Sequence, residues 1–342
     1  MILLKKELLN ALDGSVEAVR EALQHAIELE HATIPVYLYT LYSLQPGTNL
    51  EVASIIRSVV VEEMLHMSIA CNLLNAVGGH PHLDRPAFVP KYPGPLPGGV
   101  DGSLTVSLAP ISVQHVKDVF MGIEEPETPL PFKTFAAAPE RVTIGMFYDK
   151  ISRQLQESFF TGDPARQVVA EWWPSHELFA ITNLDEAHLG IKIIVEQGEG
   201  TETQPLDLEG EYAHYYRFAE IVNGKRLIPN PNATPDSPPD KRYIYGGAPV
   251  SFDSSKVQPL ATNPALTPYP VGSSAQIAND AYNATYTNVL RSLHQVFNGQ
   301  PELLRSAIGT MESLKEQAYT LTSFQLDPKT FAGPSFQYNP VV

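Results

Sequence analysis

The stretch Val59-Val-Val-Glu-Glu-Met-Leu-His66 places a Glu-x-x-His pair inside an apolar helical pattern. Apolar residues recur every three or four positions from Val52 to Val77, and Glu63 and His66 share their helix face. A carboxylate and an imidazole on a buried face need partners, because an unpaired buried charge is heavily penalised. A second pair is found at Glu211-Tyr-Ala-His214. Two such pairs, joined by one inward Glu from each of two further helices, form a carboxylate-bridged di-metal centre in a four-helix bundle.

The two further carboxylates are found by the same periodicity. The apolar pattern upstream of the first pair contains one acid on its own face, Glu30, and the pattern over 181–199 offers Glu196. The alternative interpretation is a pair of buried His–Glu hydrogen bonds accompanied by surface acids. The predicted metal ligands are Glu30, Glu63, His66, Glu196, Glu211 and His214.

Three other residues are candidates for contacts just outside the ligands. Tyr37 lies two turns from Glu30 on the same face, where plain core packing is the alternative. Asp185 and His188 belong to an Asp-Glu-Ala-His string typical of helicases, but no phosphate-binding Gly-x-x-x-x-Gly-Lys-Ser/Thr motif accompanies it. Asp185 lies about 16 Å along the helix from Glu196, too far for a direct ligand. His66 and His214 are each expected to bind metal through one ring nitrogen and to donate the other to an acceptor.

The composition excludes several classes of protein. The 342-residue chain is 43% hydrophobic, enough for a core, and has a formal net charge of −15. That charge argues against binding nucleic acids or anionic membranes. A single cysteine, Cys71, allows neither an intrachain disulfide nor a thiolate metal cluster. The sequence shows no secretory signal and no apolar run of membrane-spanning length, so we expect a cytoplasmic protein.

The chain is expected to form two long helices, 15–44 and 50–77, that fold back on each other at Pro46-Gly47. Glu30 and Glu63 are equidistant from this turn, so antiparallel packing brings them level. Pro35 predicts a kink in the first helix. A long crossover insert, 80–175, with short helices at 112–123 and 142–160, leads to the third and fourth bundle helices. We place those two helices at 177–198 and 210–222, which gives a metal-binding bundle over 15–225.

Two further segments complete the predicted organisation. A Pro-, Ser- and Asn-rich insert, 226–274, precedes a C-terminal helical hairpin, 275–325, that packs on the bundle. Because the third and fourth helices end level with the predicted ligands, the metal site should lie at an open end of the bundle. We expect the tracts 80–100 and 224–274 to border its cavity.

Several motifs resemble the ferritin-like domain of the iminophenyl-pyruvate dimer synthase family. That family includes a domain of the enzymes that couple two tryptophan-derived imines in violacein and rebeccamycin biosynthesis. The resemblance implies an all-α, ferritin-like four-helix bundle and places the six predicted ligands at the expected positions. The matching stretches are Leu29-Glu-His-Ala-Thr-Ile-Pro-Val-Tyr-Leu38, Leu41-Tyr-Ser43, Glu62-Glu-Met-Leu-His66, Asn72-Leu-Leu-Asn75, Ile194-Val-Glu-Gln-Gly-Glu-Gly200 and His214-Tyr-Tyr-Arg-Phe218.

Carboxylates with two imidazoles suit two iron ions, with manganese as the alternative metal. The leading functional hypothesis is a di-iron oxidase or oxygenase that uses dioxygen on a small, amino-acid-derived substrate in specialised metabolism. The competing hypothesis is a non-catalytic metal-binding or ferroxidase-like protein. A third interpretation, a bundle with a vestigial site, is disfavoured because all six ligands are present. A homodimer is a candidate assembly.

Overall fold

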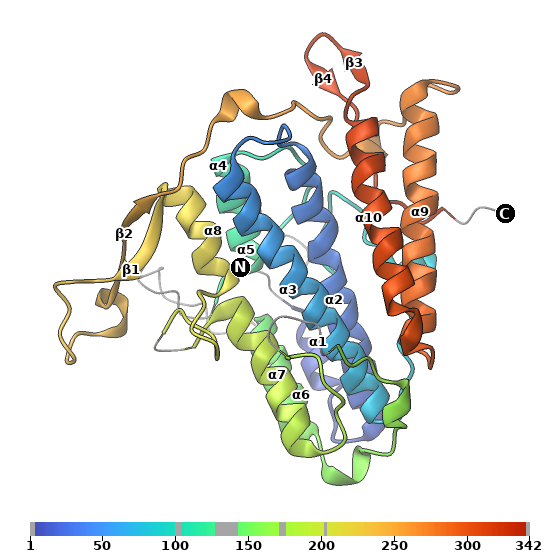
Figure 1. Cartoon of the computed structure of the whole chain (residues 1–342). Helices are drawn as coiled ribbons and strands as arrows, with labels where there is room; N and C mark the ends of the chain where they lie inside the picture. Colours follow the sequence, from blue (N-terminus) through green and yellow to red (C-terminus); the bar gives the residue numbers. More distant parts are fainter. Residues whose placement is uncertain (1–3, 100–103, 127–142, 171–175, 202–203, 340–342) are drawn as a thin grey trace.

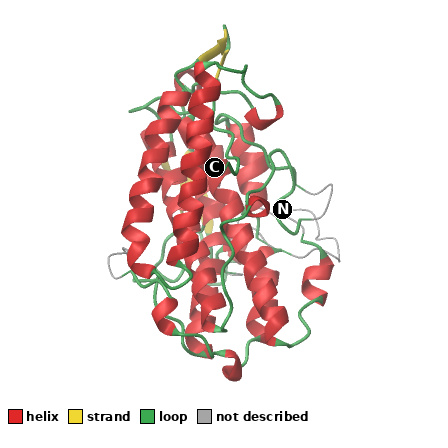
Figure 2. Cartoon of the chain, turned by 90° about the vertical axis from the view of Figure 1, so that its right-hand side faces the viewer, coloured by secondary structure: helices red, strands yellow, loops and turns green. Residues whose placement is uncertain are grey.

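The computed structural model describes residues 4–99, 104–126, 143–170, 176–201 and 204–339. Helices dominate this part of the chain, and strands are few and short (Figures 1 and 2). The all-α prediction is confirmed. Short helical segments of three to five residues include α1 (Lys6–Asn10), η1 (Pro86–Phe88), η3 (Glu157–Phe159), η4 (Pro164–Arg166), η5 (Pro239–Lys241), η6 (Ser254–Lys256), η7 (Pro264–Leu266) and η8 (Pro301–Leu303).

Two long antiparallel helices form the centre of the molecule (Figure 1). Helix α2 (Val16–Tyr42) begins at Ser15, whose side chain caps it, and continues through Pro35 without a break in the helix. Helix α3 (Leu50–Ala76) ends two residues before Gly78, which has the positive φ of +72° that favours glycine after a helix. These bounds agree with the predicted helices to within two residues at each end.

Helices α7 (Leu184–Glu199) and α8 (His214–Asn223) both pack on α3, one after the other along its length. Arg217 of α8 bonds to Ser58, whereas Gln197 of α7 bonds to His66 two turns further along α3. The two helices predicted as the third and fourth of the bundle therefore share one position beside α3, which corrects their expected arrangement.

The remaining position of the bundle is filled by helices of the crossover. One run comprises α4 (Val113–His115), a π-helical turn η2 (Val116–Phe120) and α5 (Met121–Ile123), and α6 (Ile144–Gln154) follows it in the chain. The first run packs on α8 and the second on α2 and α7. The bundle thus consists of two continuous helices and two interrupted columns. Both columns are interrupted at the height of Glu30 and Glu63.

The C-terminal hairpin of α9 (Ser274–Val296) and α10 (Leu304–Leu321) lies along the other side of α2 and α3, as Figure 1 shows. Apolar residues of α9 spaced by three or four positions are buried, as their periodicity predicted. Two antiparallel hairpins were not predicted. They are formed by β1 (Lys225–Pro229) with β2 (Tyr243–Pro249), and by β3 (Gln325–Asp327) with β4 (Thr330–Phe331). Among the described residues, no helix is both long and apolar enough to span a membrane.

Candidate metal centre

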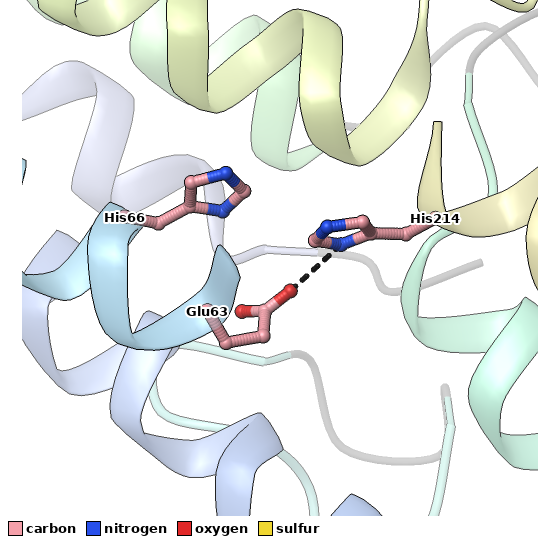
Figure 3. A group of neighbouring side chains, drawn as sticks. All are labelled: Glu63, His66 and His214. Atoms are coloured by element: carbon pink, nitrogen blue, oxygen red, sulfur yellow. Dashed lines mark ion pairs between the residues drawn. The ribbon is translucent and has the colours of Figure 1, made fainter. Parts of the chain in front are cut away.

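Three buried acids and two buried histidines meet where the two columns are interrupted. Glu30 comes from α2, Glu63 and His66 from α3, Glu124 from the residue after α5, and His214 from the first turn of α8. Single donor atoms of Glu63, His66 and His214 all lie within 4.8 Å of one another (Figure 3). Side chains from four separate segments therefore converge on one point.

The His214 ring is held between three carboxylates, two near its Nδ1 and one near its Nε2. Its Nδ1 lies 2.8 Å from Glu63 Oε1 and 3.5 Å from Glu124 Oε2. Its Nε2 lies 3.1 Å from Glu62 Oε2 on the outer side. Arg217 donates to the same carboxylate, with Nη1 2.8 Å from Glu62 Oε1, which keeps Glu62 ionised as an acceptor. His214 therefore donates its Nε2 proton outward and turns Nδ1 toward the cluster.

The His66 ring has the same arrangement with a neutral partner. Its Nε2 lies 2.9 Å from Gln197 Oε1, and the Gln197 amide nitrogen donates to Glu177 Oε1 at 2.7 Å. Because the Gln197 amide nitrogen is used in this way, its oxygen accepts the proton of His66 Nε2. His66 Nδ1 then faces Glu30 Oε2 at 3.7 Å. A histidine that binds a metal typically donates its other nitrogen to an acceptor, as both rings do here.

Three hydroxyl groups fix the carboxylates. Tyr37 donates to Glu124 Oε1, and Tyr148 of α6 donates to Glu30 Oε1 at 2.5 Å. The hydroxyl of Thr33 lies 2.9 Å from Glu63 Oε2. One oxygen of each acid is thereby bonded to α2 or α6, and the other is near a histidine.

Crowding of these groups shifts their proton affinities. Burial, together with the neighbouring Glu124, raises the pKa of Glu63 to about 7. Burial lowers the pKa of His214, but hydrogen bonds to Glu124 and other carboxylates outweigh it and raise that pKa well above its usual value. The pKa of His66 is raised in the same way, with Glu30 opposing the effect of burial. Buried carboxylates that retain protons near neutral pH are typical of sites built for a cation.

These side chains fit a metal centre. Glu30, Glu63, His66 and Glu124 line a cavity of about 30 Å³, enough for a water-sized ligand but not for an organic molecule. Oxygen donors with two imidazole nitrogens suit iron or manganese, and no thiolate lies among them. Glu199 of α7 also lines the cavity, where its Oε1 accepts from the Gly145 amide at 2.9 Å.

Four of the six predicted ligands are brought together: Glu30, Glu63, His66 and His214. Glu196 is not, because its carboxylate turns to the outer face of α7 and lies 3.8 Å from Lys192 Nζ. Glu211 is exposed in the loop before α8, where its amide donates to Asp207. Because α8 begins only at His214, the spacing from Glu211 to His214 is not a helical one.

The other predictions around the site have mixed outcomes. Tyr37 is buried at the centre and bonded to Glu124. Asp185 and His188 are exposed, and His188 lies 3.3 Å from a backbone oxygen of Ser152, away from the cluster. The described residues of the tracts 80–100 and 224–274 do not line the cavity, contrary to expectation. Helices α2, α3, α5, α6 and α7 line it instead, because α5, α6 and α7 all have an end at that level.

Sequence reasoning missed Glu124, Gln197 and Glu199. Glu124 follows a short helix in the crossover, and neither a Glu-x-x-His motif nor a long apolar pattern accompanies it. Gln197 and Glu199 follow Glu196 by one and three residues. Periodicity alone does not fix which of these side chains points inward at the end of a helix. The buried Gln197 is the better indicator of the inner face there.

Comparisons with known proteins agree with this architecture. The ferritin-like family model matches residues 23–223. A search of curated proteins found no match. The crystal structure of a ferritin-like protein from Caulobacter vibrioides is similar in fold, with a TM-score of 0.60 and 23% sequence identity over 88% of this chain and 93% of that one. With more than half of its length matched, including every residue of the cluster, this chain belongs to the ferritin-like family.

Proposed function

We propose that this protein is a di-iron oxidase or oxygenase that acts on a small, amino-acid-derived molecule in specialised metabolism. The observation that carries the proposal is the convergence of Glu63, His66 and His214, with Glu30 and Glu124 beside them. Manganese is the alternative metal, since it accepts the same donors. The sequence motifs around Glu30, Glu63 and Glu196 favour a reaction that couples two substrate molecules, as in the iminophenyl-pyruvate dimer synthase family.

Two iron ions held there would supply one-electron redox chemistry and a place for dioxygen to react. The protein's own groups orient the ligands and handle protons. Tyr37 presents a proton at Glu124 Oε1 and Tyr148 presents one at Glu30 Oε1. Glu62 accepts a hydrogen bond from His214 Nε2, and Arg217 keeps the Glu62 carboxylate charged. The clustered acids and histidines are themselves buried, which strengthens each of these interactions.

The small size of the cavity favours a second candidate, a ferroxidase-like or non-catalytic metal protein. About 30 Å³ holds ions and a water-sized ligand, so an organic substrate would need lining side chains of α5, α6 or α7 to move. The two candidates share the metal site and differ in whether an organic molecule is consumed.

The metal site is tested by two matched substitutions. Glu63→Ala should remove most bound metal, whereas Glu211→Ala should leave metal content unchanged, because Glu211 lies outside the cluster. Elemental analysis of the purified proteins measures both. Equal metal loss in the two variants, or loss in neither, would refute the assignment.

The two functions are separated by supplying substrates. Iron-loaded protein is mixed with dioxygen, with and without a tryptophan-derived imine. Oxygen uptake and a coupled organic product that require the imine support the oxidase. Rapid iron oxidation that is unaffected by the imine supports the ferroxidase-like candidate and rejects the oxidase.

A further inference from the structure

A larger cavity lies between the bundle and the C-terminal hairpin, on the side of α2 and α3 away from the metal centre. Its volume is about 510 Å³, and we call it the hairpin groove. On α2, Ile34 and Leu38 line it, whereas Thr33 and Tyr37 face the carboxylates. Its walls are mainly apolar and include Met64, Leu290, Ile308 and Met311. Figure 1 shows α9 and α10, which contribute lining residues, alongside the α2–α3 pair.

The hairpin groove has the size and shape of a site for one long molecule. It extends along α10 from Leu304 to Tyr319, about 22 Å at the helical rise. At its far end Tyr319 packs edge to face on Tyr42, with ring centroids 6.2 Å apart. Ligand sites commonly have volumes of about 300–1,000 Å³ and mostly apolar walls with a few polar groups.

A buried polar pair in this groove has an unused hydrogen. The Tyr286 hydroxyl lies 2.8 Å from His31 Nε2, and His31 Nδ1 has no hydrogen-bond partner among the described residues. If the hydroxyl donates to Nε2, the proton on Nδ1 is free; if Nε2–H donates, the hydroxyl proton is free. Either tautomer leaves one donor without an acceptor, and an unmet buried donor is costly. His31 Nδ1 has almost no accessible surface, so an oxygen atom of a ligand in the groove would meet the pair at the Tyr286 hydroxyl.

The rim of the groove favours an acid over a neutral molecule. Arg57 of α3 and Lys315 of α10 are exposed there, together with Glu312, and none of the three forms an ion pair within the described ranges. In a chain of net charge −15, two cations against one acid form a local positive region.

From these features we propose that the hairpin groove binds a long-chain fatty acid. The tail lies along the apolar walls, a carboxyl oxygen accepts the unused hydrogen of the His31–Tyr286 pair, and Arg57 and Lys315 attract the negative charge. This inference does not depend on the proposed function, because the groove and the metal centre use opposite faces of α2 and α3.

The test uses the full-length protein with palmitate and methyl palmitate as probes, measured by displacement of an environment-sensitive apolar dye. One palmitate should bind per chain, at least about tenfold more tightly than its methyl ester. Ile308→Trp fills the groove and should weaken palmitate binding by at least about tenfold. Ile277→Trp, at an exposed position of α9 outside the groove, should not affect it. Metal content should be unchanged in both variants.

A surface variant keeps the test independent of folding. Arg57→Glu should weaken binding of palmitate but not of its ester, whereas Arg305→Glu, exposed on α10 outside the groove, should affect neither. Failure of the wild-type protein to bind palmitate, or binding untouched by both Ile308→Trp and Arg57→Glu, would overturn the proposal. So would an Ile308→Trp variant that converts a dimer to a monomer without any fatty-acid binding, since the groove would then be an interface between two copies.

Discussion

At the scale of single residues, the orientation of the donor atoms distinguishes this cluster from an ordinary group of buried acids. Both histidines direct Nδ1 inward because Gln197 and Glu62 occupy their Nε2 atoms. Rotation of either ring would leave a buried nitrogen without a partner, at a cost of about 1–3 kcal/mol. The groups outside the ligands therefore determine the geometry that a metal ion would meet.

Gln197→Ala should weaken metal affinity by about 10–100-fold, because His66 loses the acceptor that fixes its tautomer. Gln295→Ala, at an exposed position of α9, is the control and should have no effect. Titration with ferrous iron under anaerobic conditions measures both affinities. Equal affinities in the two variants would show that Gln197 does not position the ligand.

Arg217→Leu should destabilise the fold by about 3 kcal/mol, because Glu62 would be left charged and largely buried. Adding Glu62→Gln should recover much of that loss, since the amide oxygen can still accept from His214. Arg153→Leu removes an exposed ion pair with Asp149 and should change stability by less than about 1 kcal/mol. Denaturant unfolding gives these values. A cost no larger than that of the Arg153 variant would argue against a structural role of the pair.

At the scale of elements, the interruption of two columns creates the site. Continuous helices would place side chains of the third and fourth columns at fixed helical spacings. Here Glu124 follows the end of α5, Gln197 lies in the last turn of α7, and His214 begins α8. The contact between α6 and α7 also passes through a helix end, where the Gly145 amide donates to Glu199.

Gly145→Ala should disturb this contact without unfolding the protein. An added Cβ would lie 2.7 Å from Glu199 Oε2, so the carboxylate would have to move away from the amide. We expect metal affinity to fall by about tenfold while thermal stability changes little, since alanine favours the helix by up to about 1 kcal/mol. Gly309→Ala on α10, where an added Cβ meets nothing within 4 Å, is the control. Unchanged iron affinity in the Gly145 variant would remove Glu199 from the site.

At the scale of the whole molecule, the metal centre lies at the junction of the segments that make up the bundle. Helices from four parts of the chain contribute to it, and the acids they bring repel one another. A bound cation or bound protons must relieve that repulsion. Folding stability and metal binding are therefore coupled through the same side chains.

The metal-free protein should lose stability as pH rises from about 5 to about 8. The pKa of Glu63 is raised from 4.5 to about 7, and those of His66 and His214 are raised above 6.5. A group whose pKa is higher in the folded than in the unfolded state stabilises the fold fully at pH values below its unfolded-state pKa. That contribution is lost as the pH rises through its folded-state pKa. The lowered pKa of Glu62 acts in the opposite direction, but only as pH falls below its ordinary value of 4.5.

Thermal unfolding across this pH range, with and without iron, measures the effect. Iron should stabilise increasingly toward higher pH, where it no longer competes with protons. Glu63→Gln should flatten the decline of the metal-free protein below about pH 7, because its titrating group is gone. A metal-free protein that is more stable at about pH 8 than at about pH 5.5 would contradict the electrostatic account.

The sequence by itself determined the helical fold, the antiparallel pair α2–α3 and the ligands that this pair presents. Glu30, Glu63 and His66 lie on long apolar helix faces, where a period of 3.6 residues fixes which side chains point inward. The C-terminal hairpin was predicted for the same reason. These are local properties, repeated over enough turns to be unambiguous.

Only the tertiary structure decided which residues complete the centre. Glu124 enters from the crossover, and Glu196 and Glu211 turn away, because helix ends and long connections have no periodicity to fix their direction. The pairing of α7 with α8 along one side of α3 likewise depends on packing between segments far apart in the chain. The hairpin groove also depends on tertiary packing, since its walls belong mainly to four helices and its volume follows from how closely they approach one another.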